Sequence, residues 1–133
     1  MAAKILDSYS LLSYLEGTQQ AQDIIKLIKA ARDNERDLLI SSVSWGEVLL
    51  LIAKELGLEK VAVAENMLET LPIAIVPADQ TLARQAAIYA ATKQLPYTTC
   101  FAVALAKLRK AELVTGDKKI KQMAGEIRIR WLQ

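Results

Sequence analysis

Three acidic residues stand at positions in the chain where they could bind a cation. Asp7 follows the apolar pair Ile5-Leu6, Glu47 ends segment 41–47, and Asp117 follows segment 113–116. Carboxylates that cluster repel one another, which raises their pKa values unless a cation compensates the charge. Mg²⁺ and Mn²⁺ prefer such oxygen-rich sites and also bind phosphate oxygens. If the three acids converge, their chemistry predicts a metal-dependent phosphodiesterase.

The composition excludes most other hydrolytic chemistry. The chain has 133 residues, no histidine and a single cysteine, Cys100. Without histidine there is no imidazole base, no Ser-His-Asp triad and no Cys-His pair. One cysteine excludes an intrachain disulfide and a thiolate-rich zinc site. Water activated by a divalent cation is therefore the expected nucleophile.

We expect a soluble, cytoplasmic protein with one domain over residues 1–133. The length is close to that of one domain, and 53% of the residues are hydrophobic while 24% are charged. The N-terminal segment reaches Asp7 before a signal-peptide apolar region can develop, and no uncharged apolar stretch of about 18 residues could span a membrane. A lone cysteine is consistent with a reducing compartment.

Short apolar runs alternate with longer segments of helical periodicity. Most of the runs lack the polar alternation of half-exposed strands, which favours buried parallel strands. The predicted strands are 3–6, 38–41, 73–76, 112–115 and 127–131. The predicted helices are 10–15, 20–32, 44–56, 59–70, a helix capped by Asp79 that ends near 92, and 98–110 with Thr98 or Thr99 as N-cap. This alternation predicts an α/β fold, a three-layer α/β/α sandwich around a central, mostly parallel sheet of about five strands.

The three acids all fall at one edge of the predicted sheet. In an open parallel sheet, ligands bind beyond the carboxyl ends of the strands, near the point where the strand order reverses. Each acid also has a structural alternative, since Asp7 and Asp117 suit helix N-caps and Glu47 suits a capping box with Ser44. Both interpretations stay open for each residue alone, whereas the coincidence of three favours a joint site.

The charge is divided unevenly along the chain. The net charge of +2 combines −3 over residues 1–106, with nine basic and twelve acidic residues, and +5 over residues 107–133, with eight basic and three acidic. A basic C-terminal region can attract a polyanion, although a solvated lysine face explains it equally well. Lys118, Lys119 and Lys121 border Asp117 and are the candidate contacts for the phosphates of such a polyanion.

Four segments, in order along the chain, resemble motifs of the PIN-domain ribonucleases, especially the VapC-type toxins of prokaryotic toxin–antitoxin pairs. They are ILDSYSLL at 5–12, SSVSWGEV at 41–48, LPYTTCFAVALA at 95–106 and LVTGD at 113–117. The resemblance covers essentially the whole chain. It implies a parallel sheet of about five strands flanked by helices, Mg²⁺- or Mn²⁺-dependent endoribonuclease activity, homodimers, and inhibition by a cognate antitoxin protein.

Carried over by position, the resemblance makes Asp7, Glu47 and Asp117 the metal-binding and catalytic acids. The family pattern has Asp at the position of Thr99, so this catalytic position offers a neutral oxygen and no negative charge. Weaker metal binding is expected with three carboxylates rather than four. Three explanations stay open: a nuclease with one metal ion, a catalytically impaired PIN-fold module that dimerises and binds antitoxin or RNA, and a substitution introduced by engineering.

Overall fold

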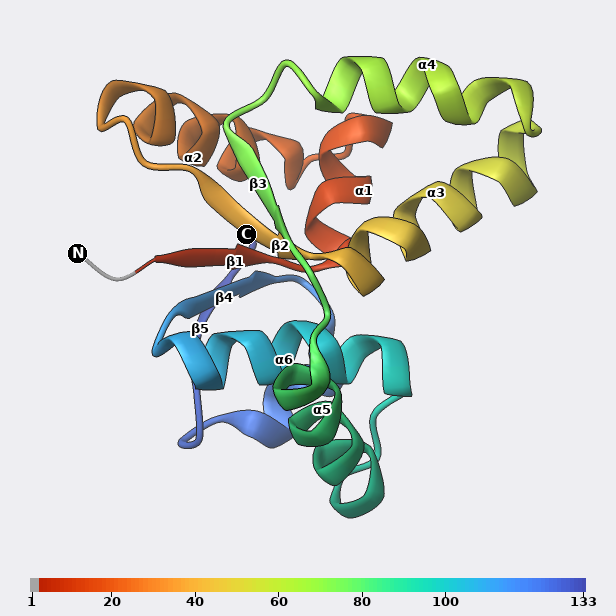
Figure 1. Ribbon diagram of the computed structural model, residues 1–133. Coiled ribbons are helices and arrows are strands. Elements are labelled where there is room, and N and C mark those ends of the chain that lie inside the picture. The colour runs from red at the N-terminus through yellow and green to blue at the C-terminus, as the bar shows by residue number, and fades with distance from the viewer. Residues whose placement is uncertain (1–2) are drawn as a thin grey trace.

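The computed structural model describes residues 3–133 and contains a five-stranded parallel sheet (Figure 1). Its strands are β1 (Lys4–Leu6), β2 (Leu38–Ser41), β3 (Ile73–Val76), β4 (Glu112–Thr115) and β5 (Arg128–Trp131). The order is β3-β2-β1-β4-β5, and every neighbouring pair is parallel. The chain moves outward from β1 through β2 to β3 and then returns to the other side of β1. The strand order therefore reverses between β1 and β4, where such sheets bind ligands.

Helices cover both faces of this sheet. They are α1 (Ser8–Glu16), α2 (Ala21–Asp33), α3 (Ser42–Leu56), α4 (Glu59–Leu68), α5 (Gln80–Thr92) and α6 (Tyr97–Arg109), with a 3₁₀ helix η1 at Lys118–Met123. In Figure 1, α1 and α2 lie on one side of the sheet with α3 and α4 beside them, and α5 and α6 lie on the other. The predicted three-layer α/β/α fold is confirmed.

Each face of the sheet has its own hydrophobic core. Under α5 and α6 the core contains Ile5, Leu113 and the consecutive residues 100–106 of α6. Under α1 to α4 it contains Leu6 and Val114, the strand residues next to those of the first core. Successive strand residues point to opposite faces, so a strand buried on both sides has an unbroken apolar sequence. This explains why the apolar runs predicted the strand positions closely.

Five of the six predicted helices, all except α5, begin or end at other residues than predicted. Three differences from the predictions bear on the site. Helix α3 starts at Ser42 with Ser41 as its N-cap, whose hydroxyl accepts a 3.0 Å hydrogen bond from Ser44 N–H. A capping box between Ser44 and Glu47 is therefore wrong, and Glu47 is free for other contacts. Helix α6 is capped by Pro96 without a side-chain bond, so neither predicted threonine N-cap is correct. The third difference is η1, which we did not predict, because its six residues are too short for a periodic signal.

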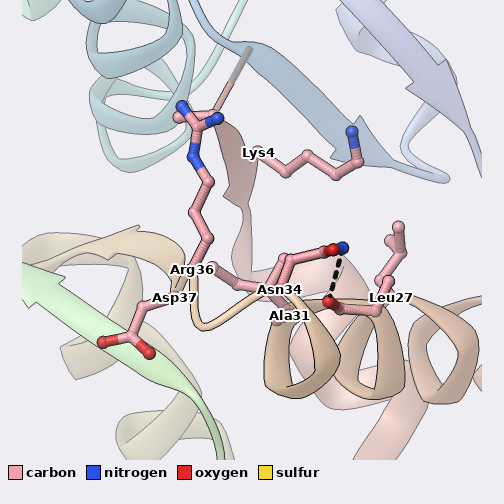
Figure 2. A pocket seen from close by; sticks show the side chains of 9 residues that line it. Lys4, Leu27, Ala31, Asn34, Arg36 and Asp37 are labelled. Atoms are coloured by element: carbon pink, nitrogen blue, oxygen red, sulfur yellow. Dashed lines mark hydrogen bonds between the residues drawn. The ribbon is translucent and has the colours of Figure 1, made fainter. Parts of the chain in front are cut away.

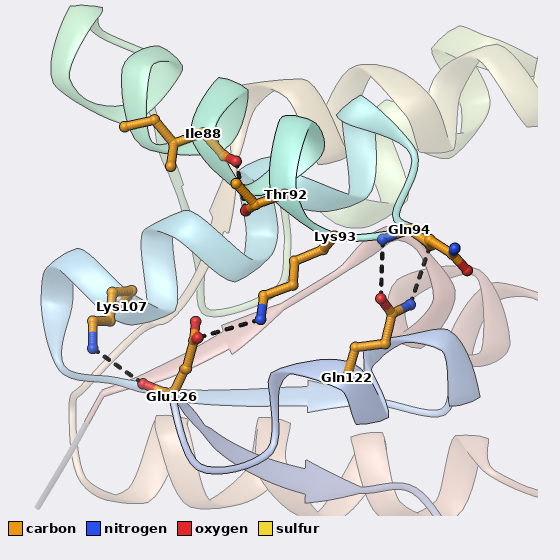
Figure 3. Close-up of polar contacts among 7 residues, drawn as sticks. All are labelled: Ile88, Thr92, Lys93, Gln94, Lys107, Gln122 and Glu126. Atoms are coloured by element: carbon orange, nitrogen blue, oxygen red, sulfur yellow. Dashed lines mark hydrogen bonds and ion pairs between the residues drawn. The ribbon is translucent and has the colours of Figure 1, made fainter.

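Hydrogen bonds and an ion pair join the segment after β4 to the turn between α5 and α6 (Figure 3). Gln122 accepts a hydrogen bond from the Gln94 N–H at 3.0 Å and donates one to the Gln94 carbonyl at 3.1 Å. Lys93 pairs with Glu126 at 3.3 Å, and Lys107 donates to the backbone carbonyl of Glu126 at 3.3 Å. These contacts hold η1 in place, and with it the lysines that follow Asp117.

Within residues 3–133, no helix is long and apolar enough to cross a membrane.

Candidate active site

Asp7 lies at the carboxyl end of β1, in the central strand of the sheet, and is 4% exposed. It is the N-cap of α1: its Oδ1 accepts the Ser10 N–H at 2.8 Å, and its own N–H donates to Ser10 Oγ at 3.1 Å. The other oxygen, Oδ2, accepts a hydrogen bond from the Thr115 hydroxyl. Asp7 can therefore be both the N-cap of α1 and a residue of the site. Its Oδ1 caps the helix, and its Oδ2 faces Thr115.

The environment of Asp7 disfavours its charged form. Burial raises the pKa of this carboxyl from 3.8 to about 6, and the nearby charge of Asp117 contributes in the same direction. Hydrogen bonds from Thr115 and Ser10 oppose the increase in the pKa but do not cancel it. A buried carboxyl of this kind gains if a cation binds beside it.

Asp117 is joined to Asp7 through one threonine. The Thr115 hydroxyl that donates to Asp7 also accepts a 3.0 Å hydrogen bond from the Asp117 N–H. The Asp117 carboxylate accepts the Lys119 N–H at 3.0 Å and so caps η1. Thr115 is completely buried at the end of β4, one strand from Asp7. This threonine therefore links the two acids.

Glu47 belongs to the same edge through a different pair of hydroxyls. Ser8 donates to its Oε1 at 2.5 Å, and Thr98 donates to its Oε2 at 2.8 Å. Ser8 is the residue after Asp7, so the start of α1 connects the two acids in the chain. Both oxygens of Glu47 accept hydrogen bonds, which fixes the orientation of this side chain on the second turn of α3. The sequence did not identify Thr98 as a contact, because only a tertiary contact reveals which of two adjacent threonines faces the acid.

Thr99 is half-buried next to this contact, on the first turn of α6. Among the hydrogen bonds of residues 3–133, the side chain that reaches Glu47 from α6 is that of Thr98. The role predicted for Thr99 stays a prediction.

The three lysines that follow Asp117 are all exposed. Lys118 and Lys121 line a pocket of about 470 Å³ together with Gly116 and Trp131, and Lys119 is not one of its lining residues. The pocket adjoins the carboxyl edge because Gly116 and Lys118 flank Asp117 in the chain. Two of the predicted phosphate contacts, Lys118 and Lys121, therefore line this pocket, and the third, Lys119, does not.

A second pocket lies at the opposite edge of the sheet, where β1 and β2 begin (Figure 2). It has a volume of about 180 Å³, and Lys4, Asn34, Arg36 and Asp37 contribute its polar groups. Lys4 is paired with Glu112 at 3.4 Å. This pocket contains none of the three predicted acids and is remote from the strand ends that carry them.

The donor chemistry at the carboxyl edge fits a hard divalent cation. The available groups are carboxylate and hydroxyl oxygens, which Mg²⁺ and Mn²⁺ prefer. The raised pKa of Asp7 points the same way, because a cation would relieve the electrostatic cost of its ionised form. In the described part of the chain, however, no three acidic or cysteine side chains form a group that could hold one ion. Asp7 and Asp117 are neighbours joined through Thr115. Glu47 does not complete a three-acid cluster with them.

Comparison with known proteins gives a match at the level of the family. A model of the PIN domain matches residues 4–126. No curated protein sequence matches the chain significantly.

Solved structures share the fold over nearly their whole length. A DNA-bound VapBC from Salmonella typhimurium has 18% sequence identity and a TM-score of 0.74, with 100% of both chains covered. VapBC2 from Rickettsia felis, bound to a fragment of promoter DNA, has 11% identity and a TM-score of 0.76, covering 98% of this chain and 99% of that one. VapC20 from Mycobacterium tuberculosis, a toxin that cleaves the sarcin–ricin loop, has 13% identity and a TM-score of 0.69, covering 96% and 99%. At these identities the similarity establishes the fold.

Proposed function

The chain belongs to the PIN-domain family, and from that premise we propose that it is a metal-dependent endoribonuclease and the toxin of a VapBC-type pair. The observation that supports this function best is the linked set Asp7, Thr115 and Asp117 at the point where the strand order reverses. PIN domains are in general nucleases. VapC20, which has the same fold, is described as a toxin that cleaves the sarcin–ricin loop.

The residues of this chain prepare the site before substrate arrives. Thr115 aligns Asp7 with Asp117, and Ser8 and Thr98 fix both oxygens of Glu47. Groups held in this way need little rearrangement when the charge of a phosphodiester approaches. Asp7 and Asp117 would hold the cation, and Glu47 would orient a water molecule bound to it.

A bound divalent cation supplies positive charge that compensates the carboxylates, stabilises charge on the phosphate and lowers the pKa of water. Asp7 would then stay ionised at neutral pH, because the cation offsets the burial that raises its pKa. Lys118 and Lys121 would hold the flanking phosphates, and Thr99 would contribute a neutral oxygen.

A second candidate function follows from Thr99. With a threonine at the family's acidic position, and no three-acid cluster among residues 3–133, the protein could be a catalytically impaired PIN-fold module that binds antitoxin or RNA. The two functions differ in whether the acids support turnover.

One cleavage assay separates the two functions. Purified protein is incubated with structured RNA and Mg²⁺ or Mn²⁺, alongside Asp7→Asn and Thr99→Asp. We expect cleavage by the unmodified chain and its loss in Asp7→Asn. Activity that appears only in Thr99→Asp supports the impaired module, and equal cleavage by all three refutes the catalytic role of Asp7.

The proposed antitoxin partner is supported by an apolar groove between α1, α3 and α4. The groove has a volume of about 470 Å³, and its lining includes Leu56, Val63 and Met67, which are 62%, 56% and 50% exposed. Exposed apolar surface of this extent commonly marks a protein interface. Five of the similar structures are described as VapBC or as a toxin–antitoxin complex.

We further propose a homodimer in the cytoplasm, where RNA substrates are found. Leu50, on α3, is 52% exposed and gives this helix an apolar surface beyond the face that packs in the core. Light scattering over a range of protein concentrations tests the dimer, and a monomer at every concentration refutes it.

A further inference from the structure

The pocket beside Asp117 combines an aromatic wall with two lysines. It lies between the ends of β4 and β5, η1 and the residue before α2, and its lining residues are Gln20, Gly116, Lys118, Lys121, Trp131 and Leu132. We propose that this pocket binds one nucleotide of the substrate RNA next to the cleaved bond, with the base against Trp131 and the phosphate near Lys118 and Lys121. The proposal rests on the ribonuclease function and adds a subsite to it.

The strand register places Trp131 close to the acids. Trp131 is the partner of Thr115 in the pairing of β4 with β5, and the Leu132 N–H donates to the Thr115 carbonyl at 3.0 Å. Thr115 is the residue that joins Asp7 to Asp117. A base on Trp131 would therefore lie one strand away from Asp117 and two strands away from Asp7, which suits a nucleotide adjacent to the reacting phosphate.

The wall formed by Gln20 is held by its neighbours. Tyr9 donates a 2.8 Å hydrogen bond to the Gln20 side-chain oxygen, and the Gln20 side-chain nitrogen donates to the Leu132 carbonyl at 3.4 Å. Gly116 leaves room for the Tyr9 ring, because a Cβ at this position would overlap a ring carbon. The pocket is thus formed before a ligand enters, which reduces the ordering cost of binding.

The charge and the aromatic surface are both available to a ligand. Lys118 and Lys121 are exposed, and neither lysine side chain forms an ion pair or hydrogen bond with another residue of the described chain. Trp131 is half-buried, and it packs partly against the core while also lining the pocket. Stacking of a base on an aromatic ring with lysines along the backbone is the usual way that proteins bind single-stranded RNA.

Binding without turnover tests the pocket directly. The probe is a fluorescein-labelled RNA tetranucleotide, measured by anisotropy in EDTA, so that cleavage does not contribute. We expect about tenfold weaker binding for Trp131→Leu, from the usual strength of base stacking, and nearly unchanged binding for Trp131→Phe. Lys118→Ala and Lys121→Ala should each weaken binding and reduce its dependence on salt by about 0.7 in the log–log slope.

The matched control is Lys26→Ala, since Lys26 is an exposed lysine of α2 and is not among the residues that line the pocket. Its affinity for the tetranucleotide should not change. Thermal unfolding of each variant separates loss of binding from loss of folding, and the two lysine variants keep the test valid if Trp131→Leu unfolds. Wild-type affinity in all three pocket variants overturns the proposal.

Two further arms separate this subsite from simpler alternatives. Trp45→Phe leaves Trp131 as the only tryptophan, so quenching of its fluorescence by the unlabelled tetranucleotide is expected, and no quenching refutes stacking. If tripolyphosphate displaces RNA from Trp131→Leu and wild type equally well, the pocket is an anion site without base binding and the proposal fails. If the protein cleaves RNA and the pocket variants bind and cleave it as well as wild type does, only the subsite is refuted. If the pocket variants bind RNA more weakly but the wild-type protein does not cleave it, only the nuclease function is refuted.

Discussion

Replacing Asp7 by asparagine should stabilise the protein more at pH 8 than at pH 4, relative to the unmodified chain. Burial raises the pKa of Asp7 from 3.8 in a model peptide to about 6 in the folded protein. The folded chain therefore binds this proton more tightly than the unfolded chain does. Stability is lost as the pH rises through this window, because the unfolded state releases the proton first.

The size of the effect follows from the two pKa values. Each pKa unit is worth about 1.36 kcal/mol, so the buried charge of Asp7 costs about 3 kcal/mol of folding free energy above pH 7. At pH 4 the residue is still protonated in the folded state, and most of this cost is absent. The asparagine side chain is neutral at every pH, so the stability advantage of Asp7→Asn should grow by about 2.5 kcal/mol between pH 4 and pH 8.

The measurement is denaturant unfolding of both proteins at the two pH values, in the presence of a chelator. Asparagine is as good an N-cap as aspartate, and any hydrogen bond lost to Thr115 costs the same at both pH values and cancels in the comparison. The matched control is Asp79→Asn, because Asp79 is also a helix N-cap, bonded to Leu82 N–H at 2.9 Å, but is exposed. We expect little change in stability for this variant.

Two results would refute this reasoning. If Asp7→Asn changes stability equally at pH 4 and pH 8, burial does not penalise the charge of Asp7. If its relative stability falls as the pH rises, Asp7 is a stabilising ion held by its hydrogen bonds. Adding Mn²⁺ at pH 8 should stabilise the unmodified protein more than the variant, because a ligand that binds only the folded state raises its stability.

Two other predictions concern the groups around the acids. Thr98→Val removes the donor to Glu47 and should lower the rate of RNA cleavage about tenfold, as expected for a hydrogen bond to a charged group. Thr98→Ser keeps the hydroxyl and should retain most of the rate. Equal rates in the two variants would contradict the role of Thr98 in positioning Glu47. Gly116→Ala would place a Cβ against the Tyr9 ring, closer than atoms can approach, and should cost about 1–3 kcal/mol in thermal unfolding. Adding Tyr9→Ala should remove most of that cost, and purely additive effects would argue against the contact.

The sequence predicted the strands more closely than the helix ends. Three of the five strands have the predicted bounds, and the other two, β1 and β5, begin one residue later. Most of these strands are short and largely apolar because they are covered on both faces, so they stand out from the segments around them in the sequence. The edge strand β5, with the sequence RIRW, is the exception, since charged and apolar residues alternate in it. Helix starts depend on single hydrogen bonds, and so the N-caps of α3 and α6 escaped prediction.

The candidate site was predictable in its acids and not in the hydroxyls that hold them. Asp7 directly follows β1, and Asp117 follows β4 after one residue, Gly116, so the topology alone brings both acids to one edge. Ser8, Thr98 and Thr115 are common residue types whose side chains become informative only when their partners are known. A sequence pattern records which residues end a strand, but it does not record which hydroxyl faces which oxygen across the fold.

Asp7 is both the N-cap of α1 and a residue of the candidate site. Its Oδ1 is committed to the first turn of α1, and its Oδ2 faces Thr115 and the edge of the sheet. Helix formation therefore fixes the orientation of the Asp7 carboxylate. The resemblance predicts that position 99 belongs to the site, where a neutral threonine adds no negative charge. An aspartate there would raise the electrostatic cost of folding the empty site and increase the attraction for a cation. Stability without metal and affinity for metal should accordingly change in opposite directions when Thr99 is replaced by aspartate.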